Sequence, residues 1–398
     1  GKGFTSLFLL NVTLIQLVSS FIGGPALVYL LPRLGIERLL IPSYGWTFIT
    51  ALSIPFLLHL FGLQPSEHLY DLIFIGGLHA AGQIHMQLLL GEEKIKEHNW
   101  ISFGQAFFLL ASLWFFFEIL DIRDISAYIG ALYISYLFTL VASFLKIYSS
   151  IGTTPESELK GTWTITIRSL INHGAWIQLA NVSQLLNYRL SYYLIEKLIP
   201  VNSMDSLGYY STAINLAEAC WVVSKAMAMV QYSKLSNTSN PIEIRRISVQ
   251  MWKLSFYSGL FLIAPLLLIP PSFWDFLFGV GQGFGQIRVL LLILAPGILF
   301  MSLSNSMSAH FAGQALYKVN ARVSAVGLLS TLVLSPLLIH HFGLIGAAWA
   351  TSISFVLASV YQTYLFIEKG RIPLSDLLPS RADGLLFTNA LKAFLGKK

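Results

Sequence analysis

The sequence predicts an all-α, polytopic membrane protein with about eleven transmembrane helices. Of its 398 residues, 55% are hydrophobic and only 11% are charged, whereas about 25% are charged in an ordinary soluble domain. Apolar runs recur from end to end, each near the ~20 residues that a helix needs to cross a bilayer. This composition excludes a soluble enzyme, a secreted disulfide scaffold and a nucleic-acid-binding domain. The single cysteine, Cys220, lies in an apolar run, so no intrachain disulfide is expected.

The apolar segments follow one another with short connections. Those at Asp121–Asp124 and His340–His341 predict turns between antiparallel neighbours. The expected spans are Phe4–Leu31, Ile41–Leu63, Leu69–Leu90, Trp100–Leu120, Ile125–Tyr148, Ile167–Leu198, Leu207–Leu235, Ile247–Ile269, Val289–Gly313, Ala321–Ile339 and Phe342–Ile367.

The longest internal break is polar and separates five expected spans from six. The start of the chain, Gly3–Ser6 (GFTS), loosely repeats Gly208–Ser211 (GYYS), which opens the seventh span. Two tandem halves of six spans would make twelve, with the first helix of the first half absent here. Internal repeats of this kind are typical of transporters. The expected parts are an N-terminal helical bundle over 1–148, a cytoplasmic linker over 149–166, a C-terminal helical bundle over 167–367 and a basic cytoplasmic tail over 368–398.

Basic residues predict the orientation of the chain. Seventeen of the 25 lysines and arginines fall in the tail and in loops on one side, four fall on the other side, and four lie within spans. Because cytoplasmic loops carry the excess of basic residues, we expect a cytoplasmic C-terminus and an external Gly1.

Three motifs carry a resemblance to a known family. They are Gly343–Thr351 (GLIGAAWAT), Leu207–Ala213 (LGYYSTA), and Gly23–Val28 (GGPALV) followed by Leu31–Arg33 (LPR). In order and spacing they resemble the Wzx-like polysaccharide or O-antigen lipid flippases of the multidrug/oligosaccharidyl-lipid/polysaccharide (MOP) exporter superfamily. The resemblance covers essentially the whole chain except the first helix.

The resemblance implies a fold and a function. The fold would be a 6 + 6, two-bundle, V-shaped transporter around a central cavity, here lacking its first helix. The function would be flipping of an undecaprenyl-pyrophosphate-linked oligosaccharide across the bacterial inner membrane by alternating access, for synthesis of cell-surface polysaccharide such as lipopolysaccharide. Many relatives carry an Asp–Arg pair in the seventh helix, where this sequence reads Asn187-Tyr188-Arg189. A mechanism that needs that carboxylate would not apply.

Charged residues inside spans are costly, by ~2.5–3.5 kcal/mol each, and are therefore candidate functional groups. Arg189 and Lys225 would make the cavity cationic and hold the lipid pyrophosphate. The alternative is a structural ion pair between Arg189 and Glu218, which are expected at similar depth, with Lys225 extending toward the inner surface. We expect Glu218 to be a structural partner rather than a proton carrier.

Uncharged polar residues form a second signal. Gln178, Asn181, Gln184 and Asn187 recur at every third position of the sixth span, and Asn305 of the ninth span is expected to face the same space. These side chains would offer hydrogen bonds to sugar hydroxyls in a wet cavity, because polar groups facing lipid are disfavoured. The alternative is hydrogen bonding between helices, which contributes ~0.6 kcal/mol on average.

Other sequence features predict no catalytic chemistry. His79 and His85 lack a third ligand at metal spacing, so no metal and no cofactor are expected. Gly279–Gly285 lacks the strand-to-helix setting of a nucleotide-binding loop and is expected to be a flexible outer loop.

We therefore expect a transporter and not an enzyme. A cation-coupled multidrug exporter of the same superfamily is the alternative, and a glycan polymerase or acyltransferase is a more distant one. The expected partners are lipid-linked oligosaccharide, membrane lipids, H⁺ or Na⁺ as coupling ion and other polysaccharide-assembly membrane proteins, with no nucleic acid.

Overall fold

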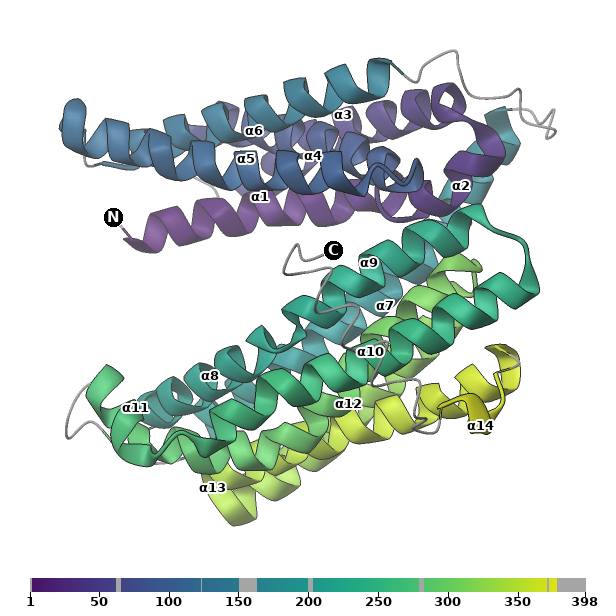
Figure 1. Ribbon diagram of the computed structural model, residues 1–398. Coiled ribbons are helices and arrows are strands. Elements are labelled where there is room, and N and C mark those ends of the chain that lie inside the picture. The colour runs from purple at the N-terminus through teal and green to yellow at the C-terminus, as the bar shows by residue number, and fades with distance from the viewer. Residues whose placement is uncertain are drawn as a thin grey trace, which may run out of the picture. The chain divides into compact units, whose positions relative to one another are not determined.

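The protein is an array of helices throughout the part that the computed structural model describes (Figure 1). That part comprises residues 2–61, 66–122, 124–149, 163–199, 203–278, 283–370 and 372–377. Within it, eight helices are long and apolar enough to cross a membrane, and a bent pair makes a ninth. The all-α membrane class that the sequence predicts is confirmed. The chain divides into two compact units, Gly1–Gln178 and Leu179–Lys398.

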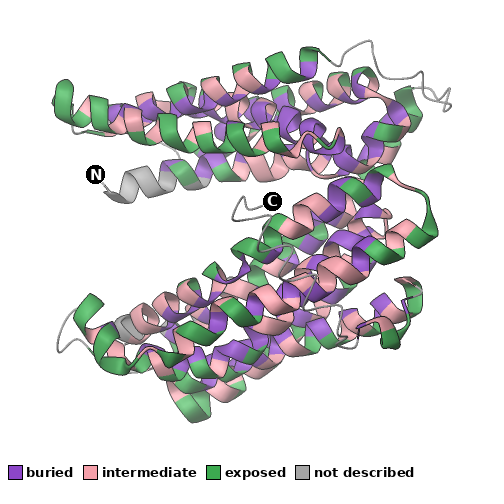
Figure 2. Ribbon diagram, viewed as in Figure 1, coloured by how far each residue is buried: buried purple, intermediate pink, exposed green. Residues whose placement is uncertain are grey.

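The first unit is built around α4, which packs against α1, α3 and α6. Its apolar core includes Phe8, Ile15, Leu72 and Leu132, all of which are almost fully buried. The peripheral helix α5 buries only Ile101 and Ser112 and leaves its other residues exposed or partly exposed (Figure 2), as expected for a span that faces lipid. The helices of this unit are α1 (Lys2–Gly23), α2 (Ala26–Leu34), α3 (Ile36–Leu60), α4 (Leu69–Gly91), α5 (Ile95–Trp114) with a π-helical end at Phe115–Ile119, and α6 (Ile125–Tyr148).

The first predicted span is broken into α1 and α2. The break falls at Gly24-Pro25, where Pro25 has no backbone N–H to continue the helical hydrogen bonds and its ring clashes with the preceding turn. Hydropathy predicts a single span over Phe4–Leu31, because it depends on the apolarity of the residues and not on the backbone conformation.

Helix α7 (Trp163–Leu198) contributes to both units, because the division between them falls after Gln178. Its first part crosses α1 closely: a Cβ placed on Gly174 would stand 1.7 Å from the Phe21 carbonyl oxygen. Gln178 Nε2 donates a hydrogen bond to Ser20 Oγ at the same crossing. Residues 150–162 lie outside the described residues, so a domain boundary at 149–166 stays a prediction.

The second unit is built around α12, which packs against α8, α9, α10 and α13. A bend of 45° at Cys220 separates α8 from α9, so the predicted span Leu207–Leu235 is not straight. The helices of this unit, besides the second part of α7, are α8 (Ser203–Ala219), α9 (Trp221–Asn237), α10 (Pro241–Leu268), α11 (Pro271–Phe278), α12 (Ile287–Gly313), α13 (Tyr317–Gly370) and α14 (Leu374–Leu377).

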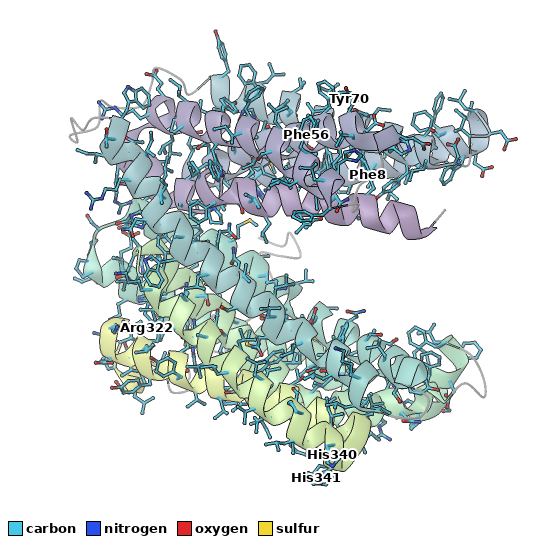
Figure 3. All side chains as sticks on the ribbon, turned by 180° about the vertical axis from the view of Figure 1, so that it is seen from behind. Phe8, Phe56, Tyr70, Arg322, His340 and His341 are labelled. Atoms are coloured by element: carbon cyan, nitrogen blue, oxygen red, sulfur yellow. The ribbon has the colours of Figure 1, made fainter. Side chains whose placement is uncertain are left out.

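Helix α13 contains two spans joined at Gly343. Its 54 residues are about twice the length that one crossing needs, and Gly343 interrupts it with φ 57° and ψ −132°, a backbone conformation that favours glycine. The turn expected at His340–His341 lies two residues later, at Gly343, and both histidines are helical and exposed. They lie at the tip of α13, at the opposite end of its first half from Arg322 (Figure 3).

Candidate functional site

The structure describes only part of the ion pair that is expected between Arg189 and Glu218 in the second unit. Arg189 belongs to α7, but its side chain lies outside the described residues. Glu218 lies near the end of α8, is partly buried, and interacts electrostatically with Tyr210. The Arg189–Glu218 ion pair therefore stays a prediction.

Lys225 lies just after the α8–α9 bend and is exposed. Its Nζ is 5.1 Å from the centroid of the Trp221 ring, within the range of a cation–π interaction. Trp221 itself is 1% exposed, and its indole N–H donates to the Ile298 carbonyl oxygen at 3.0 Å. A buried aromatic ring therefore lies beside the ammonium group of an exposed lysine.

The polar positions of α7 do not share one environment. Asn181 is exposed, whereas Gln178 is buried at the crossing with α1. Gln184 Nε2 donates to the Tyr188 hydroxyl. Asn187 is 4% exposed, and its Oδ1 accepts a hydrogen bond of 2.5 Å from Thr331 Oγ1 in α13. Gln178 and Asn187 thus bond to other helices, which is the alternative that the sequence left open, whereas Gln184 bonds within α7 and Asn181 is exposed.

Asn305 is brought close to Lys225 by the packing of α12 on α9. Its Nδ2 donates to Ser224 Oγ at 2.9 Å, and Ser224 directly precedes Lys225 in the chain. Asn305 is partly buried. The structure therefore places Asn305 beside the lysine-bearing turn of α9.

The two histidines of α4 make contacts inside the first unit. His85 is 1% exposed and bonds to the Tyr44 hydroxyl and, at 3.0 Å, to Ser143 Oγ. His79 packs on the Tyr136 ring with centroids 4.3 Å apart. Across the residues with described positions, His, Cys, Asp and Glu do not gather into a group of three that could hold a metal ion.

Two curated proteins are similar to this chain in sequence, and no family model matches it. One is the capsular polysaccharide biosynthesis protein CapF of Staphylococcus aureus, 24% identical over 164 residues, which are 40% of this chain and 41% of that protein. The other is the probable low-salt glycan biosynthesis flippase Agl15 of Haloferax volcanii, 24% identical over 303 residues, which are 72% of this chain and 58% of that protein. The chain thus spans about half the length of these relatives.

Solved structures resemble the chain over nearly its whole length. An outward-facing multidrug resistance MATE family transporter of the MOP superfamily superimposes with a TM-score of 0.73 at 14% identity, covering 95% of this chain and 88% of that one. This chain has the fold of the MOP-superfamily transporters. The MATE transporter ClbM, in complex with Rb⁺, gives the same TM-score at 13% identity, with 97% and 89% covered. The resemblance that the sequence motifs carry is confirmed at the level of fold.

Within this MOP fold, a buried group of hydroxyls joins α7, α8 and α13, and the sequence analysis missed it. The hydroxyl cluster consists of Ser191, Tyr210, Ser335 and Thr351, each no more than 1% exposed. Thr351 Oγ1 lies 2.7 Å from the Tyr210 oxygen and 3.2 Å from Ser191 Oγ. Hydroxyls inside apolar runs carry no hydropathy signal. The signal that could have found the cluster is the presence of Tyr210 and Thr351 in two of the quoted motifs.

Proposed function

We propose that this chain is a flippase that moves an undecaprenyl-pyrophosphate-linked oligosaccharide across the bacterial inner membrane for cell-surface polysaccharide synthesis. The observation that carries the proposal is the alignment of 72% of the chain with a protein named as a probable glycan biosynthesis flippase. The fold of a MOP transporter supplies the scaffold for alternating access. In the proposed orientation the C-terminus is cytoplasmic, because the basic loops lie on its side of the membrane.

Lys225 is the proposed contact for the pyrophosphate. An exposed ammonium group inside a span would cost ~2.5–3.5 kcal/mol if it faced lipid, so its exposure favours a water-filled space. The Trp221 ring lies within cation–π range of the Lys225 ammonium group, and Asn305 is hydrogen-bonded to Ser224, the residue before the lysine. A lysine binds phosphate oxygens as a point charge. Arg189 and the exposed amide of Asn181 are proposed as further contacts, to phosphate and to sugar hydroxyls respectively.

A coupling ion, H⁺ or Na⁺, is proposed to drive the cycle, with the substrate gradient as the other source of energy. The likeness to ClbM, which was solved with Rb⁺, supports a cation as the coupling partner. Membrane lipids and other polysaccharide-assembly proteins are the proposed partners in the membrane.

A cation-coupled multidrug exporter is the second candidate function. The specific observation in its favour is the TM-score of 0.73 to a multidrug resistance transporter over 95% of the chain. The two candidates differ in substrate chemistry: a flippase carries an anionic lipid headgroup, whereas a multidrug exporter carries small amphipathic molecules that it expels from the cell.

The test is transport in proteoliposomes with a fluorescent lipid-linked oligosaccharide, whose exposure in the outer leaflet is read by chemical quenching. The wild type is compared with Lys225→Met and with Lys234→Met, a matched exposed lysine at the other end of α9. We expect flipping by the wild type, a loss of about ten- to a hundredfold in rate for Lys225→Met because a charge-assisted contact contributes ~1.5–3 kcal/mol, and no loss for Lys234→Met.

Two results would overturn these assignments. Equal rates for all three proteins would remove Lys225 from the site while leaving the flippase proposal in place. Absence of flipping, together with ion-driven efflux of a cationic dye, would replace the flippase by the multidrug exporter.

A further inference from the structure

The short helix α11 lies between the ends of two spans. Helix α10 ends at Leu268 and α12 begins at Ile287, and both belong to segments long and apolar enough to cross a membrane. A helix that directly connects two such ends is held near the membrane surface. The sequence treats the connection between these spans as an outer loop, whereas the structure puts a helix of eight residues in it.

The outward face of α11 is apolar. Phe273, Phe276 and Leu277 are 45%, 77% and 55% exposed, respectively, and α11 is coloured mostly as exposed in Figure 2. The one charged residue of the helix, Asp275, is held by a local contact, because its Oδ1 accepts a hydrogen bond of 2.8 Å from the Gly285 N–H. The exposed face therefore combines large apolar side chains with no charge of its own.

The inward face of α11 fixes the helix to the second unit. Trp274 is 2% exposed and belongs to the apolar core, and its ring stacks on Phe278 with an interplanar angle of 13°. Phe278 contacts Phe284 at 5.3 Å between ring centroids, and Phe284 contacts Tyr209 at 5.1 Å. These contacts occupy the inner side of α11, so the outward aromatic residues cannot be buried by a simple rotation of the helix.

We propose that α11 is an interfacial helix whose outward face inserts into the boundary between lipid headgroups and acyl chains. The partner is lipid rather than water or protein for two reasons. First, the face continues the exposed apolar surface of the adjoining spans, where Leu268 is 80% and Val289 is 47% exposed. Second, Phe and Leu side chains on one face of a surface helix are typical of helices that bury that face at the boundary of headgroups and acyl chains. The helix anchors one end of the second unit at the membrane surface.

The test is the depth of a nitroxide spin label in liposomes. Cys220, the single cysteine of the sequence and buried, is first replaced by alanine, and labels are then attached to Phe276→Cys, Phe261→Cys and Ser239→Cys. Phe261 is 60% exposed in the interior of α10, and Ser239 is exposed in the polar connection before α10. The measured quantity is the ratio of collisions with oxygen, which concentrates in the bilayer, to collisions with a water-soluble nickel complex.

The expected ratio at residue 276 lies between those of the two controls and exceeds that at residue 239 several-fold. A ratio equal to that at residue 239 would place α11 in water and overturn the proposal. Low collision rates with both reagents would show that protein covers the face and would also overturn it.

A second measurement covers the case in which labelling disturbs the fold. Phe276→Trp keeps an aromatic ring at the position, and its fluorescence is measured in liposomes with brominated lipids. Quenching greater than that of the wild type supports insertion, and quenching equal to that of a Ser239→Trp variant contradicts it. Neither test depends on which substrate the protein transports.

Discussion

The phenolic oxygen of Tyr210 in α8 lies 2.7 Å from Thr351 Oγ1 in α13. Each residue comes from one of the motifs that carry the family resemblance, LGYYSTA and GLIGAAWAT, which are more than a hundred positions apart in the chain. Ser191 of α7 joins the same contact at 3.2 Å from Thr351. The two motifs therefore describe one packed junction of three helices, which explains why they combine small residues with hydroxyls.

Replacing either hydroxyl of this junction should destabilise the second unit modestly. Tyr210→Phe and Thr351→Val each remove one partner of a buried hydrogen bond, which should lower the free energy of unfolding by about 1 kcal/mol. The double variant should lose less than the sum of the single losses, because both changes remove the same contact. Unfolding experiments in detergent measure the free energy of unfolding of the wild type and of each variant. Strictly additive losses would mean that the two hydroxyls do not interact.

The contact between α7 and α13 predicts that Gly327→Ala is destabilising. A Cβ at Gly327 would stand 2.6 Å from Asn187 Nδ2, so the amide would have to move from its hydrogen bond with Thr331. Overpacking of this kind costs about 1–3 kcal/mol. Combining Gly327→Ala with Asn187→Ala should recover part of the loss, and thermal unfolding is the readout. If the double variant recovers no stability, the contact between residue 327 and Asn187 is not the cause of the loss.

The crossing of α7 with α1 should tolerate substitution even less. Gly174→Ala would put a methyl group 1.7 Å from the Phe21 carbonyl oxygen, and a backbone atom cannot move away as a side chain can. We expect poor yield of folded protein and a larger loss of stability than for Gly327→Ala. Gly45→Ala is the matched control, since a Cβ there meets nothing within 4 Å, and a better helix former should add about 0.5–1 kcal/mol. Equal behaviour of the Gly174 and Gly45 variants would contradict the close crossing.

The proposed site predicts a loss of substrate binding on removal of Lys225. Lys225→Ala should weaken the binding of undecaprenyl pyrophosphate about ten- to a hundredfold, because one charge-assisted contact of ~1.5–3 kcal/mol is lost. The fold should be unaffected, since the side chain is exposed. Native mass spectrometry with added lipid measures the affinity. Arg189→Ala should act in the same direction, and unchanged saturable binding in both variants would remove the cationic site.

An ion pair between α10 and α14 should contribute little to stability. Arg245 Nη2 lies 2.6 Å from Asp376 Oδ2, with side-chain exposures of 48% and 25%, so solvent screens the pair. Asp376→Asn should lower stability by less than about 1 kcal/mol, and the effect should fade with added salt. The measurement is the thermal midpoint at low and high ionic strength. A salt-independent loss of several degrees would show that packing of α14, rather than charge, is responsible.

Helix positions were largely predictable, because hydropathy over ~20 residues is a local property that the bilayer imposes on each span. The prediction for Ile125–Tyr148 has the bounds of α6, and the predicted start at Leu69 is the first residue of α4. The breaks were harder to place. Pro25, Cys220 and Gly343 mark changes of helix direction that depend on the backbone, whereas the sequence profile records only apolarity.

The candidate site was predictable in residue type but not in environment. The sequence alone determined an apolar helical membrane protein with a few costly polar groups inside its spans, because each such feature follows from the residue and its near neighbours. Only the tertiary structure decided that Asn187 bonds to Thr331, that Asn305 lies next to the Lys225 turn, and that Asn181 points outward. The physical reason is that side chains such as Asn187 and Asn305 take their partners from another helix, and those partners are set by how the helices pack.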